Sequence, residues 1–303
     1  MILRHILVLF ALFWLSACSS GPDISKLPKE EHAVVILGGS AYGLAVASAL
    51  KAYDEHLDVV LVEESPIFVI EPYINLYLAG KIDEKLVFKS YDGIAKRHGY
   101  QWIDQPVVTV ERDEKLVLFA ERAIHYKRLI DARFHYDAKE GDNITVTSDF
   151  RSLKELKERL NSHTDRSILI DASALTGEAR IRAEELYNIL KTQEGTTPKK
   201  HIVFKGNDDE GSYELVIRYP SYLEGTPLRF SDNFFAQYNR ALDTAAEIVR
   251  DDLNGSFLPN MVKEERFIYQ NAETLQGIDP DTDKKGEGTE YLSKVLKIQR
   301  DFM

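Results

Sequence analysis

Short, continuously apolar segments alternate along the chain with segments in which apolar residues recur at helical spacing. Residues 33–37 (AVVIL) and 58–62 (DVVLV) are apolar segments of strand length, and between them Leu44, Ala47 and Leu50 recur every three residues. That spacing places the three side chains on one face of a helix. Two buried strands that flank a helix predict a βαβ unit with a parallel sheet.

The same alternation returns later in the chain on a smaller scale. Residues 167–170 and 201–204 are apolar and residues 183–191 show helical spacing, which predicts a second, smaller βαβ unit. The polar residues 277–288 predict a loop. The other predicted strands are residues 102–110, 115–119, 126–130 and 215–219, and the other predicted helices are residues 152–160, 233–253 and 291–302.

The amino-terminal end has the pattern of an export signal. Arg4 precedes the apolar residues 6–15, a run that is too short to span a bilayer. The sequence LSAC at residues 15–18 resembles the lipobox of bacterial lipoproteins. The resemblance implies that residues 1–17 are a cleaved signal peptide and that Cys18 carries a lipid anchor, which holds a protein durably on a membrane. The alternative is a buried amino-terminal helix that a cysteine follows by coincidence.

Two further features add to this prediction: the residue that follows the lipobox and the number of cysteines. Ser19 stands where an aspartate is the usual signal for retention in the inner membrane, so the resemblance implies a periplasm-facing protein of the outer membrane. Cys18 is the only cysteine in the chain. Its lipidation would therefore exclude an intramolecular disulfide, a dithiol redox pair and a thiolate metal site.

Charge and histidine spacing exclude some ligands. The formal net charge is -11, and removal of Arg4 with the signal makes it one unit more negative, which argues against nucleic acid or an anionic lipid surface as a main ligand. An acidic surface suits a basic protein partner, although solubility alone also explains it. The eight histidines have no metal-ligand spacing, so no metal site is predicted.

The turn after the first predicted strand carries a dinucleotide-binding fingerprint. Gly38, Ser40 and Gly43 occupy its three positions: the first permits a tight turn, the second lies where the backbone approaches a pyrophosphate, and the third allows close helix packing. The helix that follows offers unpaired N–H groups to phosphates. Glu63 ends the second strand, where an acid hydrogen-bonds a ribose hydroxyl. Ser40 departs from the ideal glycine, and an ordinary glycine-rich turn is the alternative.

At these residues the chain resembles a known family, the flavoprotein subunit of flavocytochrome c sulfide dehydrogenase and the sulfide:quinone oxidoreductases, which are FAD-dependent pyridine nucleotide-disulfide oxidoreductases. The resemblance in the first half rests on the segments ILGGSAYGLAVASAL, VVLVEESPIFVIEPYINLYLAG, FKSYDGIAKRHGYQWI and HYKRLI. Residues 230–233 (FSDN) and the helix NRALDTAAEIVRDDLNG resemble the closing Gly-Asp motif of the family and its following helix.

The resemblance implies a set of FAD contacts. Gly38, Gly39, Ser40, Gly43 and Glu63 would face the ADP half of the flavin. Val107 or Val108 would lie near the adenine, with Val108 as our choice, and Asp232 would meet the ribityl chain. Each of these three residues has an ordinary alternative, because a valine is common in any sheet core and an aspartate is a common helix N-cap.

The chain departs from the family pattern at several positions, and these departures limit which reactions of the family it could perform. The redox disulfide of the family needs cysteines near Glu71 and near residues 175–177, and this chain has neither. Glu71 is then either a base beside the flavin or a solvated loop carboxylate. Asp131-Ala132-Arg133 replaces a small turn under the flavin, so Arg133 either obstructs the isoalloxazine or pairs with a flavin phosphate. Residues 171–177 contain no nicotinamide-binding glycine pattern.

Together these features predict an α/β chain in which a Rossmann-like FAD-binding domain carries an inserted, reduced second nucleotide-binding-like βαβ domain. The expected function is a membrane-anchored FAD flavoprotein, an oxidoreductase that exchanges electrons with a cytochrome c or another carrier in the periplasm. The alternatives are a cofactor-free scaffold lipoprotein of a respiratory or sulfur-oxidising assembly and a nicotinamide-dependent dehydrogenase. The predicted segments are the signal (1–17), the tether (18–31), the FAD domain (32–148 and 213–256), the insertion (149–212) and a carboxy-terminal segment (257–303).

Overall fold

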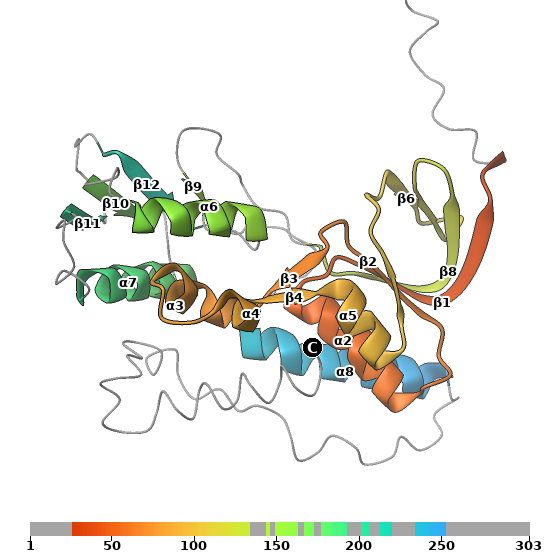
Figure 1. Ribbon diagram of the computed structural model, residues 1–303. Helices are drawn as coiled ribbons and strands as arrows, with labels where there is room; N and C mark the ends of the chain where they lie inside the picture. The colour runs from red at the N-terminus through yellow and green to blue at the C-terminus, as the bar shows by residue number, and fades with distance from the viewer. Residues whose placement is uncertain are drawn as a thin grey trace, which may run out of the picture.

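Two sheets, built largely from parallel strands, organise the chain (Figure 1). The computed structural model describes residues 26–133, 144–145, 149–162, 167–172, 177–192, 201–205, 213–219 and 234–252. The first sheet has six strands, in the order β5 (Gln101–Ile103), β2 (Val59–Val62), β1 (Lys29–Leu37), β8 (Ala123–Asp131), β7 (Leu116–Leu118) and β6 (Thr109–Glu111). The second has four parallel strands, in the order β11 (His201–Lys205), β10 (Ser167–Asp171), β12 (Leu215–Arg218) and β9 (Ile144–Thr145).

The centre of the first sheet is buried on both faces, as its continuously apolar strands predict. Val34 and Ile36 of β1 face the large core that also contains residues of the second sheet, while Val35 and Leu37 face a separate core on the other side. β1, β2, β5 and β8 run parallel, whereas β6 and β7 are antiparallel additions at one edge. The predicted α/β fold with parallel βαβ units is therefore confirmed.

Helices α2 (Ala41–Tyr53) and α8 (Phe234–Asp252) lie against each other beside the first sheet (Figure 1). Residues 41–50 of α2 are all buried, because the helix lies between the sheet and α8. The Tyr42 and Thr244 hydroxyls are 2.8 Å apart across this contact. α5 (Tyr91–His98) packs beside α2 and leads into β5.

A group of short elements connects the two sheets. β3 (Ile67–Val69) pairs with β4 (Phe88–Ser90). Between these strands lie η2 (Glu71–Tyr73), α3 (Ile74–Leu78) and α4 (Glu84–Val87). α3 contacts both α6 (Phe150–Asn161) and α7 (Gly177–Thr192), the helices of the second unit (Figure 1).

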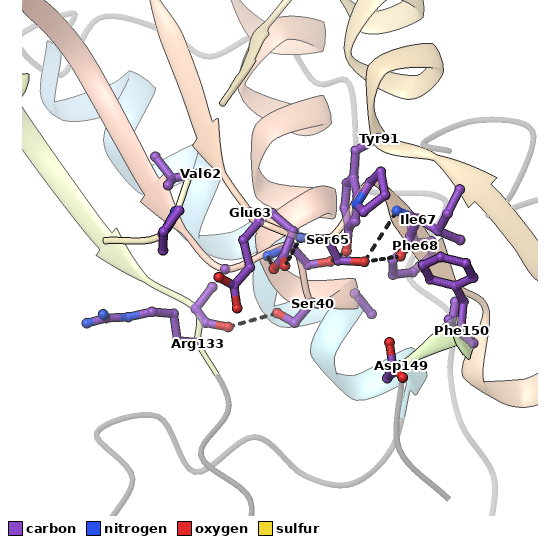
Figure 2. Close-up of a pocket in the computed structure, with 18 of the residues that line it drawn as sticks. Ser40, Val62, Glu63, Ser65, Ile67, Phe68, Tyr91, Arg133, Asp149 and Phe150 are labelled. Carbon is purple, nitrogen blue, oxygen red and sulfur yellow. Dashed lines mark hydrogen bonds between the residues drawn. The ribbon is translucent and has the colours of Figure 1, made fainter. Parts of the chain in front are cut away.

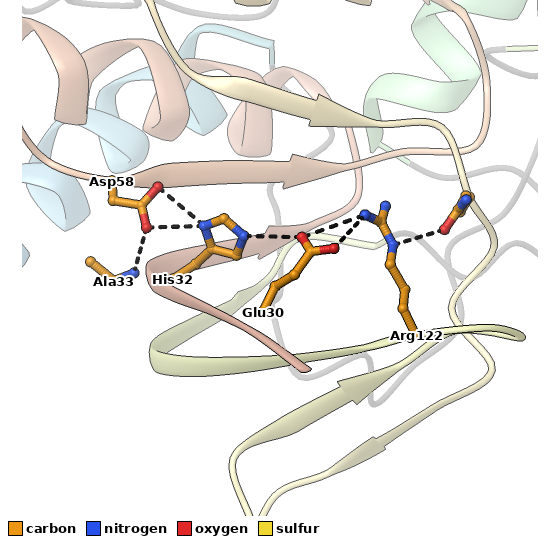
Figure 3. Close-up of polar contacts among 6 residues, drawn as sticks. Glu30, His32, Ala33, Asp58 and Arg122 are labelled. Atoms are coloured by element: carbon orange, nitrogen blue, oxygen red, sulfur yellow. Dashed lines mark hydrogen bonds and ion pairs between the residues drawn. The ribbon is translucent and has the colours of Figure 1, made fainter. Parts of the chain in front are cut away.

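Polar side chains fix the beginning of β1 (Figure 3). His32 Nδ1 lies 2.9 Å from Oδ2 of Asp58, the residue that directly precedes β2. Arg122 Nη1 lies 3.1 Å from Glu30 Oε1. Arg122 Nε also donates to Gln105 Oε1 at 3.1 Å. β1 consequently begins at Lys29, and the last three residues of the predicted tether belong to the sheet.

Several predicted boundaries are wrong. The single strand expected at residues 102–110 is two strands, β5 and β6, because Pro106 has no N–H to donate to a sheet. The predicted FAD domain includes residues 144–145 and 215–218, but these residues form β9 and β12 of the second sheet, with Ile168 opposite Leu215. An apolar strand carries no local signal of its partner, so the sequence left their pairing undetermined. The predicted loop at 277–288 and helix at 291–302 lie outside the described residues.

In the part of the chain that the structure describes, no helix combines the length and the apolar character needed to cross a bilayer.

Candidate functional site

A cleft of about 740 Å³ opens beside the carboxyl ends of β1, β2 and β8 (Figure 2). In open α/β sheets, ligands bind outside the carboxyl ends of the strands where the strand order reverses, and β1 lies at such a point between β2 and β8. The start of α6 forms part of the opposite wall, so both units line the cleft. Its lining residues are Gly38 to Ala41, Val62 to Val69, Glu71, Tyr91, Gln105 to Val107, Ala132, Arg133 and Asp149 to Arg151.

Gly38 and Gly43 have the geometry that the fingerprint predicts. Gly38 has φ +95°, and a Cβ there would lie 2.8 Å from the carbonyl atoms of Ala132. A Cβ at Gly43 would lie 2.1 Å from the Gly38 carbonyl oxygen. The tight turn and the close helix packing are therefore present, and both positions require glycine. Cofactor binding at these residues stays a prediction.

Ser40 caps α2. Its Oγ accepts from the Gly43 N–H at 3.2 Å and donates to the Ala132 carbonyl oxygen at 3.0 Å. The side chain thus satisfies one N–H of the helix terminus and ties the turn to the end of β8. The departure from glycine at this position supplies a helix cap, while Ser40 and Ala41 still line the cleft.

Glu63 lies at the end of β2 and binds the backbone of the turn. Its Oε2 accepts from the Gly39 N–H at 2.7 Å and its Oε1 accepts from the Ser65 N–H at 3.0 Å (Figure 2). A carboxylate offers about four acceptor positions, so two such bonds leave capacity for hydroxyl donors. The acid therefore lies where the fingerprint predicts it, and it also orders the turn.

Arg133 forms a bidentate pair with Asp131 at the end of β8. Nε lies 2.8 Å from Asp131 Oδ1, and Nη2 lies 2.6 Å from Oδ2. Burial acts to raise the pKa of Asp131, but the hydrogen bonds and the charge of Arg133 together hold that pKa below its usual value. A phosphate at Arg133 would have to share the guanidinium with Asp131.

At the other end of the cleft, Glu71 belongs to a charged pair. Glu71 lines the cleft, and its Oε2 lies 3.1 Å from Arg182 Nη1 of α7. The Glu71 side chain is 10% exposed, so its interpretation as a solvated loop carboxylate is wrong. A role as a base stays a prediction.

Behind this pair, Asn75 joins α3 to α7 and to the end of β12. Its Nδ2 donates to Glu185 Oε2 at 2.6 Å and to the Arg182 carbonyl at 2.9 Å, and its Oδ1 accepts from the Tyr219 hydroxyl at 2.6 Å. Burial raises the pKa of Glu185 to about 7, although the Asn75 hydrogen bond and the Arg182 charge oppose this shift. Glu185 is thus a carboxyl group that titrates near neutral pH at the junction of the two units.

The remaining predicted residues divide into three groups. Val107 lines the cleft, whereas Val108 is 57% exposed and is not among the lining residues. Its N–H donates to the Leu118 carbonyl at 2.8 Å, so its backbone belongs to the edge of the sheet. Asp232 and Cys18 lie outside the described residues. Within the described ranges, no cluster of three His, Cys, Asp or Glu side chains has a metal-binding arrangement.

Tyr91, Phe68, Phe150 and Arg182 were missed by the sequence analysis. Tyr91 is buried and donates from its hydroxyl to the Gly39 carbonyl, 52 positions earlier in the chain. Phe68 and Phe150 line the cleft from β3 and α6. Contacts between such distant segments leave no local pattern, so only the fold could reveal them.

Two comparisons by sequence found no match, neither to a family model nor to a curated protein. Among solved structures, sulfide:quinone oxidoreductase from the hyperthermophilic bacterium Aquifex aeolicus aligns over 74% of this chain and 78% of its own, with 12% identity and a TM-score of 0.59. A chain of the mitochondrial ATP synthase from Tetrahymena thermophila aligns over 94% of this chain and 98% of its own, with 10% identity and a TM-score of 0.58. At such low identities the likeness shows a shared Rossmann-like α/β fold and leaves the exact family a prediction.

Proposed function

We propose that this protein binds FAD in the cleft and works as a membrane-anchored oxidoreductase in periplasmic electron transfer. One observation carries the proposal: the Gly38 turn, the capped amino terminus of α2 and the Glu63 carboxylate form one wall of a single cleft. This is the arrangement that holds the ADP half of a dinucleotide. The fold shared with sulfide:quinone oxidoreductase supports the same cofactor.

The residues of this wall fit the ADP half. Gly38 and Gly43 leave no side chain between the turn and the helix. The amino terminus of α2 would attract a diphosphate through its partial positive charge. Glu63 would accept hydrogen bonds from a ribose, and Val107 would lie beside the adenine.

The far part of the cleft fits a planar ring. Phe68, Val69 and Phe150 supply an apolar lining, and the volume lies within the usual range for cofactor sites. When bound, the flavin ring would supply the electron chemistry. The residues of this chain would bind and orient it, and Glu71 and Arg182 would keep a neutralised pair at its end in place of a reactive thiol.

The proposed location and partners follow from the predicted anchor. Lipidated Cys18 would hold the protein on the periplasmic side of the outer membrane. The net charge of -11 would favour association with a basic electron carrier such as a cytochrome c.

A second candidate function is that of a cofactor-free scaffold in a respiratory or sulfur-oxidising assembly. It is favoured by the alignment with the ATP synthase chain, which covers nearly the full length of both chains. That neighbour belongs to a large membrane assembly, and a fold alone does not determine whether a protein is an enzyme.

The visible spectrum of the purified protein distinguishes the two functions. Residues 18–303 with Cys18→Ser retain every described residue without the lipid. The flavin proposal predicts the absorption bands of bound flavin, with close to one flavin per protein chain, either on purification or after addition of FAD. A colourless protein that takes up no FAD would refute it and favour the scaffold.

A further inference from the structure

The side chain of Tyr91 leaves room only for glycine at residue 39. A Cβ at Gly39 would lie 2.4 Å from the Tyr91 hydroxyl oxygen and 2.5 Å from two of its ring carbons. Tyr91 is 4% exposed and is the first residue of α5, whose start is fixed by the Ser90 cap. Its ring therefore cannot withdraw without displacing α5, and the turn must pass it without a side chain.

The two peptide groups that flank Gly39 are held from opposite sides. Glu63 Oε2 accepts from the Gly39 N–H at 2.7 Å, and the Tyr91 hydroxyl donates to the Gly39 carbonyl. Trp102 connects the two holding groups: its Nε1 donates to the Glu63 backbone oxygen at 2.9 Å, and its ring stacks on Tyr91 with centroids 6.2 Å apart. Tyr91, Glu63 and Trp102 thus form one continuous support under the turn.

This support matters because the turn contains two consecutive glycines. Glycine has the largest backbone freedom of any residue, so Gly38-Gly39 would be mobile without external contacts. The Gly39 carbonyl and the Ser40 N–H belong to the same planar trans peptide and point in opposite directions. By holding the carbonyl, Tyr91 also fixes the direction of the Ser40 N–H at the amino terminus of α2.

We propose that Tyr91 is a positioning residue that pre-orders the turn for the diphosphate of an ADP-containing ligand and thereby raises the affinity of the cleft for it. The inference rests on the proposed function for the identity of the ligand. The order of the turn itself follows from the Tyr91 contacts alone. A pre-ordered site binds more tightly because the ligand does not have to order the backbone.

The test replaces only the hydroxyl. Tyr91→Phe retains the ring under Gly39 and removes the donor. Tyr126→Phe is the matched control, because Tyr126 is a buried tyrosine of β8 in the core on the other face of the sheet and is not among the lining residues. Both changes are made in residues 18–303 with Cys18→Ser. This chain lacks Trp14, so Trp102 is its only tryptophan and reports on the support by fluorescence.

Three measurements are compared: amide hydrogen exchange at Gly39 and Ser40, Trp102 emission, and the dissociation constants of ADP and FAD. For Tyr91→Phe we expect faster exchange at the turn, altered Trp102 emission, and ADP and FAD binding about three- to tenfold weaker, the effect of one hydrogen bond. Tyr126→Phe should change none of the three.

The outcomes separate this inference from the proposed function. If the parent protein binds ADP and FAD, and Tyr91→Phe binds them equally well with unchanged exchange, the role of Tyr91 is refuted while the function stands. If the parent binds neither nucleotide, the proposed function is refuted, and unchanged exchange in Tyr91→Phe would then refute the ordering role as well.

Discussion

The two ends of the cleft differ in what their side chains do. At the β1–α2 turn, Gly38, Gly43 and Glu63 form a wall that matches a dinucleotide site in conformation, packing and charge. At the other end, where the family resemblance implies a redox thiol, the chain has the Glu71–Arg182 pair. On the proposed function, the chain would keep the geometry that holds a nucleotide without the thiols that the resemblance implies for its chemistry.

The largest expected effect comes from a substitution that adds a side chain at the β1–α2 turn. Gly43→Val would place a side chain 2.1 Å from the Gly38 carbonyl oxygen, a backbone atom that cannot rotate away. We expect a loss of about 3 kcal/mol or more in the free energy of unfolding and no measurable nucleotide binding. Urea unfolding measures the first and calorimetry the second. Gly93→Ala is the control, because its Cβ would meet nothing closer than 3.7 Å: binding should be unchanged, and alanine within α5 should raise the free energy of unfolding by about 0.5–1 kcal/mol.

The next effect concerns the charged end. Removal of one member of a partly buried ion pair weakens the compensation of the other charge, so Glu71→Gln and Arg182→Gln should each lower the free energy of unfolding by about 2 kcal/mol. In the double variant the losses should be less than additive by about 1 kcal/mol or more. Additive losses, measured in the same urea experiment, would show that the pair does not stabilise the junction.

The junction should also depend on pH. The pKa of Glu185 is raised from its ordinary value to about 7 in the folded protein, so the folded state binds the proton more tightly than the unfolded state. The contribution of this group to stability should therefore be greatest below about pH 4.5, and about 3 kcal/mol should be lost as the pH rises from there through 7. Glu185→Gln should remove that slope between pH 5 and pH 8. A variant that keeps the full slope would assign it to another group.

The smallest expected effect concerns the helix cap. Ser40→Ala removes the acceptor for the Gly43 N–H and the donor to Ala132. We expect a loss of about 1 kcal/mol in the free energy of unfolding, typical of a lost N-cap. Ser40→Phe, in contrast, should lower FAD occupancy by obstructing the approach to the turn. If Ser40→Phe binds FAD as well as the parent protein does, the pyrophosphate does not lie at this turn.

The two ends also differ in how well the sequence predicts them. The turn end is encoded locally: Gly38, Gly43 and Glu63 follow two apolar strands at fixed spacing, so both their positions and their conformations could be anticipated. The charged end depends on Arg182 and Asn75, which lie 107 positions apart in the chain and meet only through the packing of α3 on α7. No local pattern marks such a pair. For the same reason, β12 was recognised as a strand but assigned to the FAD domain instead of the second sheet.

The central claim is that the turn end of the cleft binds the ADP half of FAD, and competition between nucleotides tests it most directly. FAD, ADP and FMN are titrated by calorimetry into residues 18–303 with Cys18→Ser. FMN shares the ring of FAD but lacks the adenosine half. We predict that FAD binds at one per chain, that ADP binds and displaces it, and that FMN binds far more weakly. Tight binding of FMN without binding of ADP, or binding of none of the three, would contradict the claim.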